Sequence, residues 1–493
     1  MSVHTTSTHA RARPQRPDHR GSTRTTRRLK LLRGAFTVLF VVLGIRLFAL
    51  QVVDHNHFAK LSVEQVRQDL TTTALRGGIY DRYGQILAVS RPTSLVLADD
   101  YQIKQPLSEA QAMSAIVKVP VKKLDSLLSE NNGYVILTNH LDITSGHQLS
   151  AMALPGIVVQ DSSLRSYPNG PIATSLLGGT NAAGRGSAGI EYEYQKMLAG
   201  QSGITRAFVS AGGVNLPSSY STVIRKAVPG VGLELTIDTS LQFVTERALA
   251  HEISTSGALS GIAVVMDVKT GEILANASLV NTKTTAGILG PIPAWGQSMG
   301  VGGVQQTIND LAFTQAYEPG SVFKVVPFTA ALEGGLITPS TVFTVPNSIT
   351  VGGRRFHDAE NHAFEHLSAT QILAQSSNIG TYKVASRVGE AGLLAQVERL
   401  GFGQTTAVNF PGETPGLLVN AMNWYASDAV ALPIGQVDAV PPIQVLDAYN
   451  TVANGGVYVA QNTYGGTSRA VGRCTRRRRV QRGSCCRPVW TPR

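Results

Sequence analysis

The sequence predicts a multidomain protein of mixed α and β structure, an α/β (α+β) fold, behind a single N-terminal transmembrane helix. Three observations favour this fold class. The 493 residues are enough for two or three domains that each bury a core. Hydrophobic residues make up 43% of the chain and charged residues 15%, which is typical of a folded protein with a membrane segment. One long apolar run precedes a mixture of strand-like and helix-like patterns.

The long apolar run is residues 34–53, GAFTVLFVVLGIRLFALQVV. Twenty helical residues span about 30 Å, the thickness of the hydrocarbon core of a bilayer. A cleaved signal peptide is the alternative, but the run continues past Arg46 without a clear cleavage site, which favours an anchor. Residues 1–33 are basic and have no apolar period, so we expect a disordered cytoplasmic arm, with residues 54 onward outside the membrane.

The net charge of +11 comes from the two ends of the chain. Residues 1–33 hold nine Lys/Arg and one acid, and residues 461–493 hold nine Arg and no acid. The remaining 25 basic and 31 acidic residues make 34–460 mildly acidic. A nucleic-acid-binding protein needs basic residues on a folded face, so this class is disfavoured.

Cysteine usage fits a body that lies outside the membrane. All three cysteines, Cys474, Cys485 and Cys486, lie in the last 20 residues. A body without cysteine suits an oxidising space, although absence is a weak signal. The chain has no Cys/His spacing typical of a metal site, so we predict no metal.

The pattern along the chain predicts a domain boundary near Pro229, between domains at 54–228 and 229–460. The expected elements are a helix leaving the membrane at 57–70, two strands in 76–90, a strand and a helix in 233–253 with the N-cap near Thr239 or Ser240, a hairpin at 261–279, a mostly helical region at 306–400, and a helix at 443–456.

EPGSVFKVV, residues 318–326, contains the strongest local signal for chemistry. Pro319 and Gly320 favour a tight turn, which places Ser321 near a helix N-terminus and Lys324 one turn further on the same face. A serine hydroxyl needs an adjacent base, and lysine is a base only when burial or a nearby cation keeps it neutral. Ser-x-x-Lys by itself is a weak signal, and a solvated helix face is the alternative interpretation.

A second element is QSSNIG, in which Ser376 and Asn378 follow Ser321 by 55 residues or slightly more. A hydroxyl and an amide on one short loop can relay a proton and hold a substrate amide. In isolation, the same tripeptide is common in loops and helix caps.

Together, Ser321-x-x-Lys324 and Ser376-x-Asn378 resemble two motifs of the penicillin-recognising serine transpeptidases. Further stretches in family order narrow the resemblance to the class B, division-type, monofunctional penicillin-binding proteins, which are peptidoglycan D,D-transpeptidases. These stretches are RGGIYDRYGQILA, RSYPNGPIATSLLG, GIEYEYQKMLAGQSG, LTIDTSLQ, DVKTGEILANAS, AYEPGSVFKVV and PIGQVDAVPPIQVLDAYNTVANGGVYV. Several motifs in register are far more specific than any one of them.

The resemblance implies an elongated non-catalytic pedestal, or dimerisation domain, at 54–228, and a transpeptidase domain with an antiparallel sheet and helices at 229–460. It implies that Ser321 attacks the D-Ala–D-Ala carbonyl of a peptidoglycan stem peptide and that an amine of a neighbouring stem peptide resolves the acyl-enzyme. Lys324 would be the base, Ser376 would pass the proton to the leaving amine, and Asn378 would hold the donor backbone.

The same resemblance implies that β-lactams react with this serine and that no metal or organic cofactor is needed. The expected partners are the cytoplasmic membrane and division or elongation proteins, and not nucleic acid. Two other functions stay open: a catalytically inactive, membrane-anchored binding partner, and a β-lactam sensor or hydrolase that uses the same serine.

The sequence departs from the family in its third motif, Lys-Thr/Ser-Gly, which is expected some tens of residues after Gly456. No lysine follows that residue, and the Lys-Thr-Gly at 269–271 precedes Ser321, so we reject it as the third motif. The family's strand supplies a backbone N–H to the oxyanion. Without it and its neighbours, the strands of the 261–279 hairpin are expected to expose open edges, and the transpeptidase domain is expected to be truncated.

From Gln461 onward, apolar periodicity and acidic residues stop together. This predicts a disordered tail at 461–493 and favours out-of-frame translation. A selected RNA- or lipid-binding tail around Arg476–Arg479 is the alternative.

Overall fold

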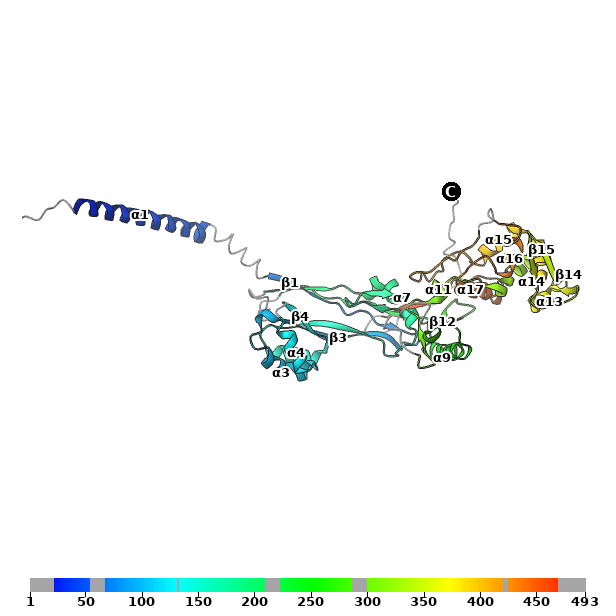
Figure 1. The fold of residues 1–493 in the computed structure, drawn as a ribbon, viewed down its shortest axis with the longest axis horizontal. Coiled ribbons are helices and arrows are strands. Elements are labelled where there is room, and N and C mark those ends of the chain that lie inside the picture. Colours follow the sequence, from blue (N-terminus) through cyan, green and yellow to red (C-terminus); the bar gives the residue numbers. More distant parts are fainter. Residues whose placement is uncertain are drawn as a thin grey trace, which may run out of the picture. The chain divides into compact units, whose positions relative to one another are not determined.

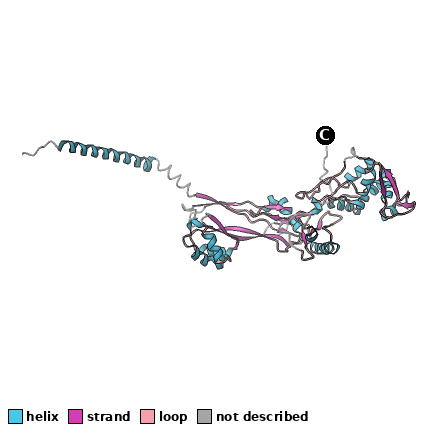
Figure 2. Ribbon diagram, in the orientation of Figure 1, coloured by secondary structure: helices cyan, strands magenta, loops and turns pink. Residues whose placement is uncertain are grey.

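The computed structural model describes residues 22–53, 67–130, 133–208, 222–285, 299–419 and 424–468 (Figures 1 and 2). Its contacts divide the chain into two units. One unit comprises the described residues up to Leu70 and those of 206–222, and the other comprises the described residues of 71–205 and 223–493.

The first unit contains the long N-terminal helix. α1 (Ser22–Phe48) continues into the π-helical turn η1 (Ala49–Val53). The prediction of a helix at 34–53 is therefore wrong at its start, because residues 22–33, expected to be disordered, are also helical. Neither Gly nor Pro interrupts 22–33, so helical propensity carries the helix toward the N-terminus.

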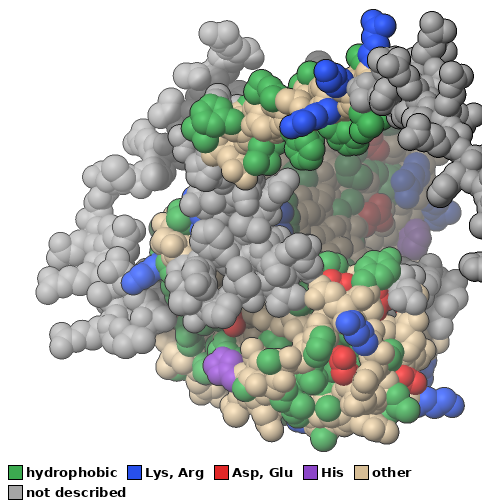
Figure 3. All heavy atoms as spheres, turned by 90° about the vertical axis from the view of Figure 1, so that its left-hand side faces the viewer, with side chains coloured by type: hydrophobic (Ala, Val, Ile, Leu, Met, Phe, Trp, Pro, Cys, Tyr) green, Lys and Arg blue, Asp and Glu red, His purple; other side chains and the backbone are tan. Residues whose placement is uncertain are grey.

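The apolar part of this helix, Arg27–Val52, is long and apolar enough to cross a membrane. Its large hydrophobic side chains are exposed, as on the upper segment of the space-filling view (Figure 3). Such a surface is unfavourable in water and favourable in hydrocarbon.

The helix predicted at 57–70 is wrong at its end. Its residues up to 66 lie outside the described ones, and Arg67–Thr72 form strand β1. β1 joins a three-stranded sheet with β8 (Gly203–Phe208) and β9 (Thr222–Arg225), in the order β1-β8-β9. The carboxylate of Asp69 accepts two hydrogen bonds from Arg206, at 2.8 and 2.9 Å. This cross-strand pair and the β-branched Thr71 and Thr72 favour a strand.

In the second unit, a six-stranded sheet has the order β18-β10-β2-β3-β4, with β5 also paired to β3. The two strands predicted in 76–90 are confirmed as β2 (Ile79–Tyr80) and the start of β3 (Ile86–Asp99). β4 (Tyr134–Asp142) and β5 (Ile157–Ser166) flank β3. Helices α3 (Pro106–Val117), α4 (Val121–Leu128) and α5 (Ile143–Ala151) share a core with these strands.

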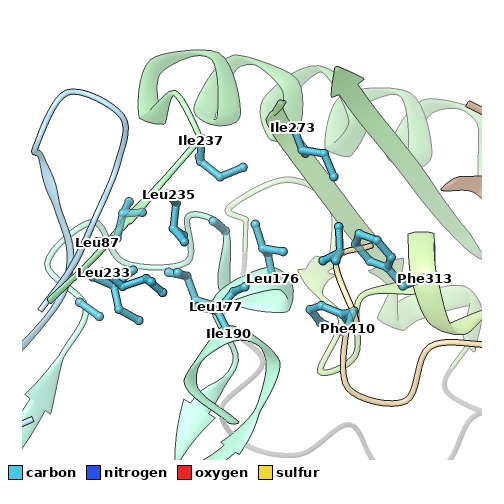
Figure 4. Packing of buried hydrophobic residues seen from close by; sticks show 14 of the residues in the cluster. Leu87, Leu176, Leu177, Ile190, Leu233, Leu235, Ile237, Ile273, Phe313 and Phe410 are labelled. Carbon is cyan, nitrogen blue, oxygen red and sulfur yellow. The ribbon is translucent and has the colours of Figure 1, made fainter. Parts of the chain in front are cut away.

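A second core crosses the boundary predicted near Pro229. β10 (Gly232–Leu235) pairs with β2 in parallel, Leu233 with Ile79. Figure 4 shows one cluster that takes Leu87 and Leu177 from one side of the boundary and Leu235 and Phe313 from the other. The two predicted domains therefore pack as one body. The short elements around this core are η2 (Asp100–Gln102), α6 (Thr174–Leu177), β6 (Gly179–Thr180), β7 (Gly186–Ala188), α7 (Gly189–Glu193) and α8 (Gln195–Leu198).

The strand and helix predicted in 233–253 are confirmed as β10 and α9 (Thr239–Ser256). The N-cap is Asp238, directly before the predicted Thr239 and Ser240, and its carboxylate accepts hydrogen bonds from the backbone N–H groups of Ser240 and Leu241.

The predicted hairpin is β11 (Ser260–Met266) and β12 (Ile273–Asn281). The expectation that both strands lack outer partners is wrong for β12, which pairs with β13 (Val304–Gln306). It holds for β11: among the described residues, no strand pairs with its outer edge. α10 (Thr282–Thr285) follows β12.

The region 306–400 is less helical than predicted. Four strands interrupt it between 342 and 368, in two antiparallel pairs. These are β14 (Val342–Val345) with β17 (Glu365–Ser368), and β15 (Ser348–Val351) with β16 (Arg354–His357). Val, Ile, Thr or Phe side chains favour strand structure in three of them, at 342–345, 348–351 and 354–357. The helical elements are α11 (Leu311–Thr314), η4 (Gly320–Lys324), α12 (Val325–Glu333), α13 (Ala369–Ala374), α14 (Asn378–Val388) and α15 (Glu390–Arg399).

The last helices are α16 (Asp428–Ala431), η6 (Leu432–Ile434) and α17 (Pro442–Ala453), the last of which confirms the helix predicted at 443–456. β18 (Tyr464–Ser468) then pairs with β10, Leu233 with Thr467. The prediction of disorder from Gln461 is therefore wrong for 461–468, in which Gln461 and Thr463 are buried. β10 supplies the hydrogen bonds that this weakly apolar segment needs to form a strand, and residues 469–493 lie outside the described ones.

Candidate active site

Ser321 lies in a tight turn between β13 and α12. The turn is the 3₁₀-helix η4, in which Gly320 has a φ of +60°. Gly320 N–H donates to the carbonyl of Gly435 at 2.9 Å. A Cβ on Gly435, whose own φ is +75°, would come within 2.1 Å of the Gly320 oxygen, so this loop closes on the turn only with glycine at 435.

Ser321 and Lys324 share one face of η4. A 3₁₀-helix has about 3.0 residues per turn, so side chains three residues apart lie directly above one another. Ser321 is exposed, whereas Lys324 is 1% exposed. The predicted arrangement of these two residues is present, in a 3₁₀ turn that continues into α12.

Lys324 brings the second predicted motif to the first. Its ammonium donates to Ser376 Oγ and to Asn378 Oδ1, each at 2.9 Å, and to the backbone carbonyl of Ser376. Three of the four predicted site residues are thus bonded together, and Ser321 is placed beside them by its position on η4. Among the described atoms, Ser321 Oγ forms no hydrogen bond with Lys324 Nζ.

The pKa of Lys324 is lowered to about 8, chiefly because burial disfavours the charged ammonium. The Asp358 carboxylate acts in the opposite direction and raises this pKa, but less strongly. Burial therefore leaves Lys324 neutral, and able to accept a proton, in a larger fraction of molecules near neutral pH than a solvent-exposed lysine.

The Ser376–Asn378 segment is held at the N-terminus of α14. Ser376 has a φ of +57°, an uncommon conformation for a residue other than glycine. Ser377 is the N-cap, and its hydroxyl accepts from Gly380 N–H at 2.8 Å. The strained backbone at Ser376 and the cap at Ser377 together turn the side chains of Ser376 and Asn378 toward Lys324.

Asp358 is the functional residue that sequence reasoning missed. Its Oδ1 accepts from the backbone N–H groups of Asn378 and Ile379, the latter at 3.0 Å. Its Oδ2 accepts from the Ser377 hydroxyl at 2.8 Å and lies 3.0 Å from His362 Nε2. Asp358 is 7% exposed. Nothing in FHDAEN marks this acid as a support of a loop about 20 residues later, so only the tertiary structure reveals it.

The Lys-Thr-Gly at 269–271 lies in the turn between β11 and β12. Asp267 closes this turn by accepting from the backbone N–H groups of Lys269 and Thr270. Lys269 Nζ donates to Asn454 Oδ1 at 2.9 Å, so this lysine is occupied away from Ser321 and Lys324. The position of this Lys-Thr-Gly agrees with its rejection as the third motif.

The site residues could hold an acyl group or a peptide amide, but they offer no ligand set for a metal. Within the described part of the chain, no group of three or more His, Cys, Asp or Glu side chains lies close enough to bind an ion. The chemistry available is that of a serine hydroxyl beside a desolvated lysine.

Two models of known protein families match this chain. Residues 71–235 match the penicillin-binding protein dimerisation domain, and residues 261–473 match the penicillin-binding protein transpeptidase domain. The second match includes β18 and agrees with the correction that the fold continues past Gln461.

Two relatives carry the comparison over most of the chain. The penicillin-binding protein PbpB of Mycolicibacterium smegmatis is 30% identical, with 86% of this chain and 68% of the relative covered. PbpB of Mycobacterium tuberculosis is 32% identical, with 86% of this chain and 63% of the relative covered. The chain thus spans about two thirds of the length of these relatives.

A solved structure gives the same result. Penicillin-binding protein 3 of Mycobacterium tuberculosis, in complex with aztreonam, has a TM-score of 0.58 and 28% sequence identity. The alignment covers 81% of this chain and 68% of that one.

Proposed function

We propose the following function for this chain, which belongs to the class B penicillin-binding proteins. Its activity is that of a serine D,D-transpeptidase, in which Ser321 is acylated by a D-Ala–D-Ala stem peptide of peptidoglycan or by a β-lactam. The observation that carries this proposal is the buried Lys324, bonded to Ser376 and Asn378 one 3₁₀ turn from an exposed serine.

The residues act in sequence. Neutral Lys324 accepts the hydroxyl proton as Ser321 Oγ bonds to the carbonyl carbon, and D-alanine leaves with a proton delivered through Ser376. Asn378 holds the peptide backbone of the donor, with its own Nδ2 anchored on the carbonyl of His357 at 3.1 Å. An amine of a second stem peptide then attacks the acyl-enzyme, and the cross-link forms as Ser321 recovers its proton.

The desolvated state of Lys324 supports its role as the base. At pH 7, a lysine with a pKa of about 8 is neutral in about one molecule in ten, compared with fewer than one in a thousand for an exposed lysine. Asp358 supports the geometry, because it fixes two backbone N–H groups of the α14 N-terminus.

A second candidate is a catalytically inactive, membrane-anchored binding partner. Two observations favour it. No Lys-Thr/Ser-Gly follows Gly456 in the sequence, and among the described residues β11 has no strand on its outer edge. A second oxyanion N–H is worth about 3 kcal/mol in other acyl-transfer enzymes, so its loss alone would slow acylation by about a hundredfold or more.

Labelling with a fluorescent penicillin separates the two candidates. Membranes that contain the full chain are compared with Ser321→Ala and with Ser386→Ala, which removes an exposed serine of α14. If the chain is an enzyme, the parent chain and Ser386→Ala should be labelled, and Ser321→Ala should not be labelled. If a folded, membrane-bound parent chain is not labelled, the chain is the inactive partner.

The membrane arrangement is part of the proposal. The basic residues before and within the start of α1 favour a cytoplasmic N-terminus and an extracytoplasmic second unit. Peptidoglycan and division or elongation proteins would then be the partners of the extracytoplasmic part. Protease added to intact spheroplasts should digest the second unit, and protection of that unit would contradict this orientation.

A further inference from the structure

A cavity of about 580 Å³ lies at β3, β4, β5 and the glycine-rich segment 178–187, and Ser321 does not line it. Arg76 and Arg165 line this cavity together with His140, and none of its lining residues is Asp or Glu. Basic side chains without an acid make a cavity attractive to anions.

Around this cavity, buried positive charges outnumber buried negative charges. The carboxylate of Glu191, which is 0% exposed, accepts from Arg76 Nε at 2.6 Å and from Arg165 Nε at 2.7 Å. Both arginine side chains are 6% exposed. Two buried guanidinium groups therefore share one carboxylate, and one positive charge has no counterpart within this cluster. Buried charge without a partner is unfavourable, so the cluster favours an additional anion.

The hydrogen bonds show which of the two arginines has a side-chain N–H group without an acceptor. Every side-chain nitrogen of Arg76 has a partner, with Nη1 bonded to Gln195 and Nη2 to the Glu191 carbonyl. Arg165 bonds through Nε to Glu191 and through Nη1 to the carbonyl of Gly77 and to Ser90. Arg165 Nη2 is buried and has no partner. Buried arginine nitrogens are normally bonded, so Arg165, which lines the cavity, keeps one donor group without an acceptor.

The rest of the lining suits a hydroxyl-rich molecule. It carries hydroxyl and amide side chains from several elements: Ser163, Thr174, Thr180, Asn181 and Ser187. Gly178, Gly179 and Gly184 also line the cavity, and their lack of side chains lets a ligand approach the backbone. Such groups both donate and accept hydrogen bonds, as sugar hydroxyls require.

We propose that this cavity binds an anionic sugar, with the carboxylate or phosphate of the sugar next to Arg165 and its hydroxyl groups along the serine and threonine side chains. The site is separate from the acyl-transfer site, and it stands or falls independently of the proposed activity of Ser321. It gives the family's non-catalytic region a ligand of its own.

Isothermal titration calorimetry of the full chain in detergent micelles tests the site with three sugars that share the glucose ring: glucose, glucuronate and glucose 6-phosphate. At least one of the two anions should bind at least tenfold more tightly than glucose. Tighter binding of glucuronate would identify a sugar carboxylate as the ligand class, and tighter binding of glucose 6-phosphate a sugar phosphate. If neither anion binds more tightly than glucose, the proposal is overturned.

A matched pair of variants locates the binding. Ser163 lines the cavity two residues from Arg165 on the same face of β5, whereas Ser162 lies on the opposite face of that strand. Ser163→Glu adds a carboxylate to the cavity lining two residues from Arg165 and should weaken anion binding at least tenfold, with Tm unchanged or raised. Ser162→Glu adds the same charge elsewhere and should leave binding within twofold of the parent. Equal effects of the two variants, or none from Ser163→Glu, would place the anion outside this cavity and sink the idea.

Discussion

Two regions of the second unit differ in how completely the described residues satisfy their hydrogen-bonding groups. We call the first the closed region and the second the open region. In the helical region around Ser321, the buried Asp358 accepts from the Ser377 hydroxyl and from two backbone N–H groups at the start of α14, and it contacts His362. In the sheet β11-β12-β13, all but one residue of β12 are buried, whereas every residue of β11 is partly exposed. The buried Asp447 of α17, a helix that contacts β11, has an Oδ1 without a partner.

The comparison teaches that the two regions depend on different parts of the chain. In the closed region, the polar groups around Lys324 and Asp358 bond to residues between 324 and 379, and Gly320 N–H bonds to the carbonyl of Gly435. A strand edge, in contrast, presents unpaired N–H and C=O groups until another segment pairs with it. Among the described residues, the polar groups around Lys324 are therefore bonded, whereas the outer edge of β11 in the open region is not paired with a strand.

The largest effect is expected from Lys324→Ala, which tests whether the closed region is catalytic. Without the buried amine, Ser321 has no base, and the rate of acylation by a fluorescent penicillin should fall by at least about a thousandfold. Lys383→Ala, which removes a lysine of α14 outside this hydrogen-bonded cluster, should label at the parent rate. Equal rates in the two variants would show that Lys324 only fills space.

The pH dependence of acylation measures how strongly the closed region desolvates Lys324. Because the base must be neutral, the rate should rise with pH and level off above the lysine pKa of about 8. Between pH 6 and pH 8 the neutral fraction increases about fiftyfold, so the labelling rate should increase by about that factor. A rate that is flat over this range would exclude Lys324 as the base.

Asp358→Asn tests whether the loop support matters for chemistry. The variant keeps the size of the side chain but removes its charge and one acceptor, so we expect acylation to slow about tenfold and the free energy of unfolding to fall by about 1–3 kcal/mol. The midpoint of the pH profile should also move to lower pH, because the carboxylate raises the pKa of Lys324. Glu360→Gln, an exposed acid nearby, is the control. A midpoint that does not move would make Asp358 purely structural.

The smallest effect, and one of opposite sign, is expected from Asp447→Asn in the open region. Burial raises the pKa of Asp447 to about 8, with Glu413 adding to the shift, so the folded state favours the neutral acid. The stability that this preference contributes is complete below pH 4 and is lost as pH rises through 8. The amide cannot ionise, so the variant should gain about 1–3 kcal/mol in the free energy of unfolding at pH 8 and nothing at pH 4.

Urea unfolding at the two pH values checks this prediction. Glu398→Gln is the control, because Glu398 is exposed and lines a small cavity of about 160 Å³ together with Asp447. A gain that is the same at both pH values would mean that folding does not raise the pKa of Asp447.

The sequence by itself determined the features that rest on local pattern. The apolar run predicted the N-terminal helix, the turn at 269–271 predicted a hairpin, and Ser321-x-x-Lys324 with Ser376-x-Asn378 predicted the two motifs that the structure brings together. Periodicity, turn residues and short spacings act over a few residues, so they can be recognised in a single chain.

The tertiary structure alone decided the rest, because it depends on partners far apart in the chain. Residues 461–468 carry no local strand pattern, yet they form β18 because β10, more than 200 residues earlier, offers a free edge. The core shared across Pro229 is likewise built from residues far apart in the chain. Asp358 accepts from a backbone N–H group of α14 only because folding brings them together, and the pKa of Lys324 is lowered only because folding buries it.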